Sequence, residues 1–185
     1  MRIPALILAL CASALLATGC ARNEEPAKQA VVSAETALNQ VRPKAAQYLP
    51  DELHAIDAKL AELKAKLAKE EYKAVLAESK DFNAEVVALN DAVVAKQTQL
   101  AAATHEWEQL SEDVPKIVQA IESQVDNLKG SKRESAKADL ESMKTMWAEA
   151  SAAFDAGNPT MAADKGRLVQ AKAKEVSEQL GVSPV

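Results

Sequence analysis

Apolar residues recur every three or four positions along most of this chain, which is the spacing of one face of an α-helix. The clearest stripe lies between residues 50 and 68, where apolar side chains follow one another at alternating steps of three and four. It consists of Leu53, Ile56, Leu60, Leu63 and Leu67. Steps of this kind place the side chains along one seam, so this helix is expected to pack lengthwise against a partner helix.

Prolines and turn residues divide the pattern into six predicted helices. They span residues 27–42, 50–68, 71–112, 114–129, 132–155 and 159–180. The first is expected to end before Pro43, because a proline disfavours helical geometry in the residue before it. Pro50 suits the first position of the second helix. The triplet Gly157-Asn158-Pro159 combines a helix stop, a cap and a helix start.

The two halves of the chain resemble each other when one is shifted by 87 residues along the other. The shift pairs Val31 with Val118, Glu35 with Glu122, Leu38 with Val125, Val41 with Leu128, Leu53 with Leu140, Ile56 with Met143, Leu60 with Trp147 and Leu67 with Phe154. It also places residues 68–72 on the turn 155–159, and so predicts a turn near 69–71. Chance alignment of heptads is the alternative, but 87 is not a multiple of seven. We therefore expect two related three-helix units, over 27–112 and 113–181.

The predicted units meet around Pro115. Ser111 or Asp113 is suited to cap a new helix there, yet the apolar stripe from Val86 to Leu128 keeps its phase through the proline. A kinked continuous helix and a clean break are both open. A helix shared between consecutive three-helix units is similar to spectrin-type repeats, in architecture only. The competing arrangement is a pair of helical hairpins in one compact bundle.

The composition supports an all-α fold, expected here as an elongated antiparallel helical bundle. Ala, Leu, Glu, Lys and Gln dominate, and these are strong helix formers. Two Trp, two Tyr and two Phe leave the core to be built from aliphatic side chains and alanine. The chain has 22 basic and 27 acidic residues and a net charge of −5. That balance argues against nucleic acid as a partner, because nucleic-acid binding requires a clustered basic face.

The first twenty residues, MRIPALILALCASALLATGC, follow a different pattern. Arg2 precedes an apolar run over residues 3–16, and small residues then lead to Gly19 and Cys20. A basic start, an apolar middle and a small-residue cleavage site are the parts of a secretory signal peptide. The run is shorter than the roughly 20 apolar residues that a membrane-spanning helix needs. We therefore expect residues 1–19 to be a signal peptide that is removed.

The cysteine directly after Ala17-Thr18-Gly19 makes this segment resemble the lipobox of bacterial lipoprotein precursors. In that family the peptide is cut before the cysteine, whose thiol carries a diacylglycerol and whose amino group receives a further fatty acid such as palmitate. The resemblance implies cleavage between Gly19 and Cys20 and lipidation of Cys20. Ala17 stands where the lipobox usually carries Leu, so an ordinary secretory signal is the alternative.

The same resemblance implies a location in the cell. In many Gram-negative bacteria an Asp directly after the lipidated cysteine keeps a lipoprotein in the inner membrane, and here that position is Ala21. An outer-membrane location facing the periplasm is therefore expected, with membrane lipid as a partner through acylated Cys20. Residues 20–26 would form the lipidated cysteine and a polar tether, and residues 182–185 a C-terminal tail. Cys11 would leave with the signal peptide.

The remaining candidate chemistry is sparse. His54 and His105 have no second His and no Cys within a helical turn, so both are expected at the rim or in solvent, and neither a metal nor a cofactor is expected. No known nucleophile or phosphate-loop motif is present. Carboxylates interleave with lysines, as in Glu62 and Lys66, and such pairs support exposed helices. We expect that the chain is not an enzyme.

Two features are candidate contact surfaces. Trp107, between two glutamates, is a possible partner contact, since large aromatics dominate interface energetics; the alternative is an ordinary core residue. A basic cluster around Gly130-Ser131 is suited to anionic lipid headgroups or an acidic partner, and a solvated loop is the alternative. The cluster consists of Lys129, Lys132, Arg133 and Lys137.

Together these features predict a non-enzymatic, membrane-anchored periplasmic lipoprotein. It would act as a binding, scaffold or accessory protein of the cell envelope, with an envelope protein as partner. The alternative is a carrier of a small molecule or cofactor with a pocket inside the helical bundle. A carrier needs polar groups that converge on such a pocket, and the sequence shows no clear set of them.

Overall fold

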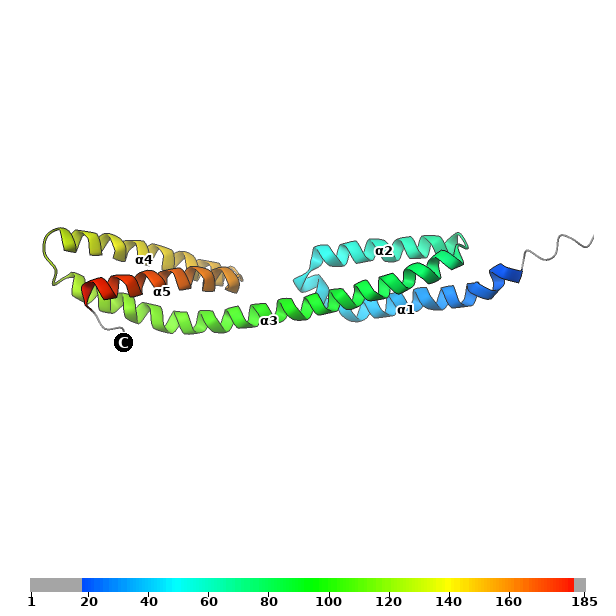
Figure 1. The fold of residues 1–185 in the computed structure, drawn as a ribbon, viewed down its shortest axis with the longest axis horizontal. Coiled ribbons are helices and arrows are strands. Elements are labelled where there is room, and N and C mark those ends of the chain that lie inside the picture. The colour runs from blue at the N-terminus through cyan, green and yellow to red at the C-terminus, as the bar shows by residue number, and fades with distance from the viewer. Residues whose placement is uncertain (1–17, 182–185) are drawn as a thin grey trace, which may run out of the picture. The chain divides into compact units, whose positions relative to one another are not determined.

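The computed structural model describes the backbone from Thr18 to Gly181 and the side chains from Asn23 onwards. This part of the chain is all-α, with five antiparallel helices and no strand (Figure 1). The helices are α1 (Thr18–Tyr48), α2 (Pro50–Ala68), α3 (Tyr72–Val125), α4 (Ser131–Asp155) and α5 (Pro159–Leu180). The all-α class is therefore confirmed. Most of the predicted signal peptide and the tail 182–185 lie outside the described residues.

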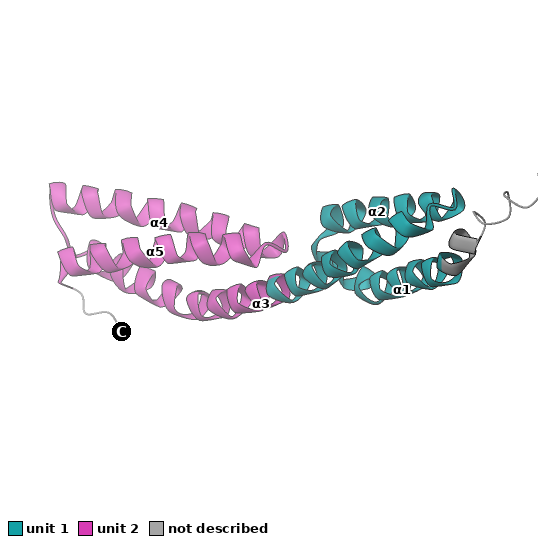
Figure 2. Cartoon of the chain, turned by 45° about the vertical axis from the view of Figure 1, so that its right-hand side comes forward, with its two compact units in different colours: residues 1–95 teal, residues 96–185 magenta. Residues whose placement is uncertain are grey.

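The chain divides into two compact units, one up to Ala95 and one from Lys96 onwards (Figure 2). Unit 1 contains α1, α2 and the first part of α3. Unit 2 contains the rest of α3 with α4 and α5. The sequence had suggested a division at 112/113, near Pro115. The observed division lies elsewhere. Helix α3 continues through Pro115, and each unit uses a part of α3 as one of its three helices.

Unit 1 is held together by apolar stripes from its three helices. The stripe of α2 packs against apolar side chains of α1 and α3 in one buried cluster. The cluster comprises Leu53, Ile56, Leu60 and Leu63 from α2, Ala34, Leu38 and Ala45 from α1, and Phe82, Val86, Leu89 and Val93 from α3. Full burial of a Val, Leu, Ile or Phe side chain stabilises a fold by about 1.5–3 kcal/mol. This core therefore holds the three helices of unit 1 together.

Unit 2 is built in the same way. Its main core comprises Leu110, Val114, Ile121 and Val125 from α3, Ala136, Leu140 and Met143 from α4, and Ala163, Val169, Ala173 and Val176 from α5. At Gly166, α5 lies close to α3: a Cβ atom there would be 2.9 Å from Leu110 Cδ1 and 3.5 Å from Trp107 Cζ3. Gly166 therefore leaves room for these two α3 side chains.

The turns between helices agree with the sequence pattern. Helix α2 spans Pro50–Ala68, as predicted, and the turn expected near 69–71 is present. Helix α5 begins at Pro159, and the side chain of Asn158 caps it by accepting a hydrogen bond from Met161 N at 3.0 Å. Turn chemistry near Gly, Asn and Pro is local, which is why these helix ends are readable from sequence.

Pro43 does not end the first helix as predicted. Helix α1 contains Pro26 and Pro43, so the predicted helix end at residue 42 is wrong, and residues 21–26, expected as a tether, are helical. A proline lacks the N–H that would reach the carbonyl four residues earlier, which costs about 3 kcal/mol in a helix interior. Leu38 and Ala45, on either side of Pro43, are both buried in the core of unit 1. Burial of both flanks offsets that cost.

The turn between α2 and α3 holds a non-glycine residue in the left-handed conformation. Glu70 has φ 61°, and its backbone N–H bonds to Leu67 O at 3.0 Å. The turn between α4 and α5 has Gly157 with φ 79° in the same place relative to its helices. The left-handed conformation costs a residue with a Cβ about 1–2 kcal/mol, and Glu70 bears this strain where Gly157 does not.

Glu70→Gly should therefore raise the free energy of unfolding by about 0.5–1 kcal/mol. Relief of the left-handed strain contributes about 1–2 kcal/mol, and the greater freedom of glycine in the unfolded chain offsets about 0.5–1 kcal/mol of it. Urea unfolding followed by circular dichroism measures the change. Lys69→Gly is the matched control, because Lys69 has φ −89° and should only lose stability. Equal losses in the two variants would contradict the strain at Glu70.

Candidate functional site

Cys20, the predicted lipidation site, falls in the first turn of α1, but its side chain lies outside the described residues, as does that of Ala21. Cleavage between Gly19 and Cys20 and lipidation of Cys20 therefore stay predictions. Close behind this position, Glu24 Oε1 accepts a hydrogen bond from Lys28 Nζ at 2.7 Å. Helix α1, which begins at Thr18, thus includes the predicted attachment residue.

Trp107 lies inside unit 2, where only 6% of it is exposed. Its ring stacks on Trp147 with the ring centroids 5.0 Å apart, and on Phe154 with the centroids 5.5 Å apart. Alanines of α4 and α5 complete this aromatic cluster: Ala150, Ala153 and Ala162. The structure therefore gives Trp107 the core position that was the alternative to a partner contact.

The aromatic cluster follows from spacing on α4. Trp147 and Phe154 are seven residues apart, so both lie on the same helix face and meet Trp107 of α3. Stacked aromatic pairs contribute about 0.5–1.5 kcal/mol beyond their buried area. In a chain with so few aromatic residues, the seven-residue spacing was the sequence signal for this cluster.

A hollow of about 160 Å³ lies beside Pro115, between α3 and α4. Its lining residues are Val114, Pro115, Val118, Gln119, Glu122, Lys144 and Trp147. Lys144 Nζ donates to Glu122 Oε1 at 2.7 Å, and this hydrogen bond raises the pKa of Lys144 above its ordinary value. Small-molecule pockets usually enclose about 300–1,000 Å³, so the hollow has room for one inserted side chain.

A second hollow, of about 240 Å³, lies between the first turns of α4 and the end of α5. Its lining residues are Lys132, Ser135, Ala136, Asp139, Val176, Gln179 and Leu180. Lys172 Nζ reaches Asp139 Oδ1 at 2.9 Å, which joins α5 to α4 at this place. Lys132 also belongs to the predicted basic cluster, so the second hollow and the basic cluster are neighbours.

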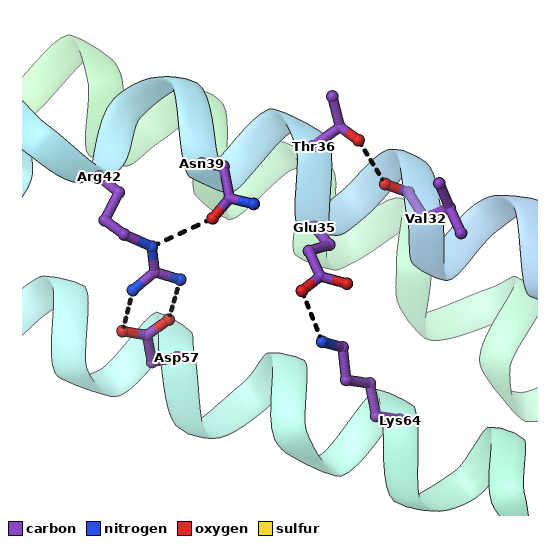
Figure 3. Close-up of polar contacts among 7 residues, drawn as sticks. All are labelled: Val32, Glu35, Thr36, Asn39, Arg42, Asp57 and Lys64. Atoms are coloured by element: carbon purple, nitrogen blue, oxygen red, sulfur yellow. Dashed lines mark hydrogen bonds and ion pairs between the residues drawn. The ribbon is translucent and has the colours of Figure 1, made fainter.

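Ion pairs connect neighbouring helices of unit 1. Arg42 of α1 donates to both carboxylate oxygens of Asp57 on α2, at 2.7 and 2.6 Å, and to Asn39 Oδ1 at 3.1 Å (Figure 3). The hydrogen bonds to Asp57 raise the pKa of Arg42. Lys64 Nζ donates to Glu35 Oε1 at 2.7 Å across the same interface. Partly exposed pairs contribute at most about 1 kcal/mol each, so they adjust register more than they add stability.

The ion-pair partner of Lys66 differs from the one inferred from the sequence. The spacing suggested a pair with Glu62 along α2, whereas the structure bonds Lys66 to Glu78 of α3, which raises the pKa of Lys66. Unit 2 shows the same preference for pairs between helices. Arg167 of α5 bonds both carboxylate oxygens of Glu106 on α3, at 2.8 and 2.9 Å. Such pairs depend on helix register, which local spacing does not reveal.

Both histidines are exposed. His105 Nδ1 lies 3.8 Å from Glu108 Oε2, and His105 Nε2 lies 3.3 Å from Gln109 Nε2. In the described part of the chain, no group of three His, Cys, Asp or Glu side chains is placed to hold a metal ion. Within the same residues, no helix has the length and apolar character needed to cross a membrane.

Comparison with protein-family models, with curated proteins and with solved structures gave no match to this chain.

Trp107→Ala should lower the free energy of unfolding by about 3–5 kcal/mol, because it empties the centre of the aromatic cluster. Trp107→Phe keeps a ring against Trp147 and should lose much less. Urea unfolding followed by circular dichroism compares them. His105→Ala, two residues away and exposed, is the control and should change stability by no more than about 0.5 kcal/mol. A loss in Trp107→Ala as small as in this control would place the ring outside the core.

Pro115→Ala should raise the free energy of unfolding by about 1–3 kcal/mol. The alanine restores an N–H for the carbonyl of Ser111 and removes the clash of the proline ring, whose cost in a helix interior is about 3 kcal/mol. Pro43→Ala in α1 should also raise the free energy of unfolding, because the alanine N–H can bond to the carbonyl of Asn39. Urea unfolding measures both variants, and lower stability in both would show that these helices require their prolines.

Proposed function

We propose that this chain is a lipid-anchored protein of the bacterial cell envelope that works by binding or spacing other envelope components, without chemistry of its own. The observation that carries the proposal is the segment ending in Gly19-Cys20, with its basic start, apolar run and lipobox-like close. Acyl chains on Cys20 would hold the chain at a membrane, since each buried methylene contributes about 0.8 kcal/mol and two chains anchor stably. Cys20 lies in the first turn of α1, so no separate linker joins the attachment residue to the helical body.

The proposed membrane is the outer one, with the helical body in the periplasm. This rests on Ala21, which occupies the position where an Asp would favour retention in the inner membrane. The exposed helix faces, on which acidic and basic residues alternate, are suited to contact partners.

We also propose that the two units are repeats of one three-helix unit, similar to spectrin-type repeats only in sharing a helix. Helix ends support this: Ala68 and Asp155 close α2 and α4, and Tyr72 and Pro159 open α3 and α5, in both cases 87 residues apart. Buried positions support it as well. Pairs with both members buried are Ala27/Val114, Ala34/Ile121, Leu38/Val125, Leu53/Leu140, Ile56/Met143, Leu63/Ala150, Val75/Ala162, Ser79/Gly166, Phe82/Val169, Val86/Ala173 and Leu89/Val176.

The aromatic cluster favours binding through outer surfaces over a carrier function. A carrier would hold its ligand between the helices of a unit, and in unit 2 the stacked rings of Trp107, Trp147 and Phe154 fill that space. Native mass spectrometry of the purified protein compares the two functions. We expect the mass of the acylated chain; an additional bound small molecule would favour the carrier.

Cys20→Ser should abolish acylation and leave the protein as an uncleaved precursor or in the aqueous phase after detergent phase separation. Wild-type protein should enter the detergent phase and carry the mass of its acyl chains. Cys11→Ser is the matched control, because it removes the other cysteine within the predicted signal peptide and should be processed normally. If Cys20→Ser fractionates like wild type, the lipid anchor is wrong.

A further inference from the structure

Four basic side chains gather at one end of unit 2, where α3 turns into α4. Lys129 lies in the turn, Lys132 and Arg133 lie in the first turn of α4, and Lys137 lies one to two turns further on. All four are exposed. Residues 129–137 contain these four basic residues and a single acidic one, Glu134, within a chain of net charge −5. We refer to Lys129, Lys132, Arg133 and Lys137 as the basic end.

Most other basic residues of unit 2 already have carboxylate partners. The ion pairs are Lys116–Glu112, Lys144–Glu122, Lys165–Glu149, Arg167–Glu106 and Lys172–Asp139. At the basic end, Arg133 is 3.8 Å from Asp126, whereas Lys129, Lys132 and Lys137 form no ion pair within the described residues. These three side chains are exposed, and an anionic partner would not have to break existing ion pairs to reach them.

The hollow between α4 and α5 adds a partly apolar surface beside these charges. Its lining is mixed: Ala136, Val176 and Leu180 are apolar, and Lys132, Ser135, Gln179 and Asp139 are polar, with Asp139 paired to Lys172. A phosphate held by Lys132 would have the glycerol and upper acyl carbons of its lipid next to this apolar lining. The charged lysines and the apolar residues thus lie next to each other, as the charged headgroup and the apolar chains do in a phospholipid.

We propose that the basic end of unit 2 docks on a bilayer of anionic phospholipids, with headgroup phosphates against the lysines. This rests on the proposed function, because the anchor at Cys20 keeps anionic lipid at high local concentration. Lysine ammonium groups are compact charges on flexible stems that need no fixed partner geometry. A fluid layer of phosphates suits such groups better than the fixed carboxylates of an acidic protein.

Acetylation of lysines on the vesicle-bound mature protein tests the docking. On vesicles containing phosphatidylglycerol, Lys129, Lys132 and Lys137 should react about fivefold more slowly than on pure phosphatidylcholine, since each basic residue near an anionic surface gains roughly that factor. Mass spectrometry reads each site. Lys44 and Lys80 are the internal control, because they are also exposed, form no ion pair within the described residues, and lie further along α1 and α3 from the attachment residue. Raised salt should remove the protection.

Paired variants make the test specific. Lys132→Glu with Arg133→Glu should abolish the protection of Lys129 and Lys137, whereas Lys44→Glu with Lys80→Glu, which changes the net charge equally, should leave it intact. The proposal is overturned if protection is the same at control lysines, or if it is absent on anionic vesicles. Protection in native envelopes but not on anionic vesicles would also overturn it and would indicate an acidic protein as the partner.

The two proposals fail in different ways. Association with pure phosphatidylcholine vesicles reports the anchor at Cys20 alone, and its absence would count against the proposed function. The basic end is read separately, from the difference between the anionic and neutral vesicles, and an unanchored chain would still show it by sedimentation with the anionic ones.

Discussion

Each helix of this chain has only a narrow apolar stripe, and such stripes are buried from water only when three helices face one another. Large aromatic side chains are few, so the helices approach closely through alanines and, at Gly166, through the absence of a side chain. Each unit meets this constraint with three helices, and α3 serves as the third helix of both. Burial of apolar surface, at about 25 cal/mol per Å², is the term on which the remaining features depend.

Burial of apolar surface also explains the features that depart from local sequence preferences. Pro43 and Pro115 lie inside helices because core residues on both sides of them are buried, which outweighs one missing hydrogen bond. Glu70 takes a left-handed conformation because packing of α2 and α3 requires a tight turn there. The ion pairs between helices lie at the edges of the cores and add little energy, so they refine a register that the apolar contacts have set.

The sequence predicts what is local and misses what depends on packing. Helices α2 and α5 are predicted with their observed bounds because Pro50, Pro159 and the adjacent turn residues mark their ends. The end expected before Pro43 fails because tertiary contacts override a local preference. Trp107 was ambiguous, since its neighbours in sequence are charged and its stacking partners lie on α4. The candidate lipidation site is a contiguous motif, so it can be proposed from sequence, and it stays a prediction because the side chain of Cys20 lies outside the described residues.

An anchored binding protein should hold its partner only where its anchor places it, and photo-crosslinking in the native envelope measures this most directly. Suitable positions for the photoreactive residue are Val87 in unit 1 and Leu168 in unit 2, whose side chains are exposed. We expect a discrete crosslinked envelope protein with wild-type Cys20 and its loss with Cys20→Ser at equal protein level. The same crosslinked species in both, or none in either, would contradict it.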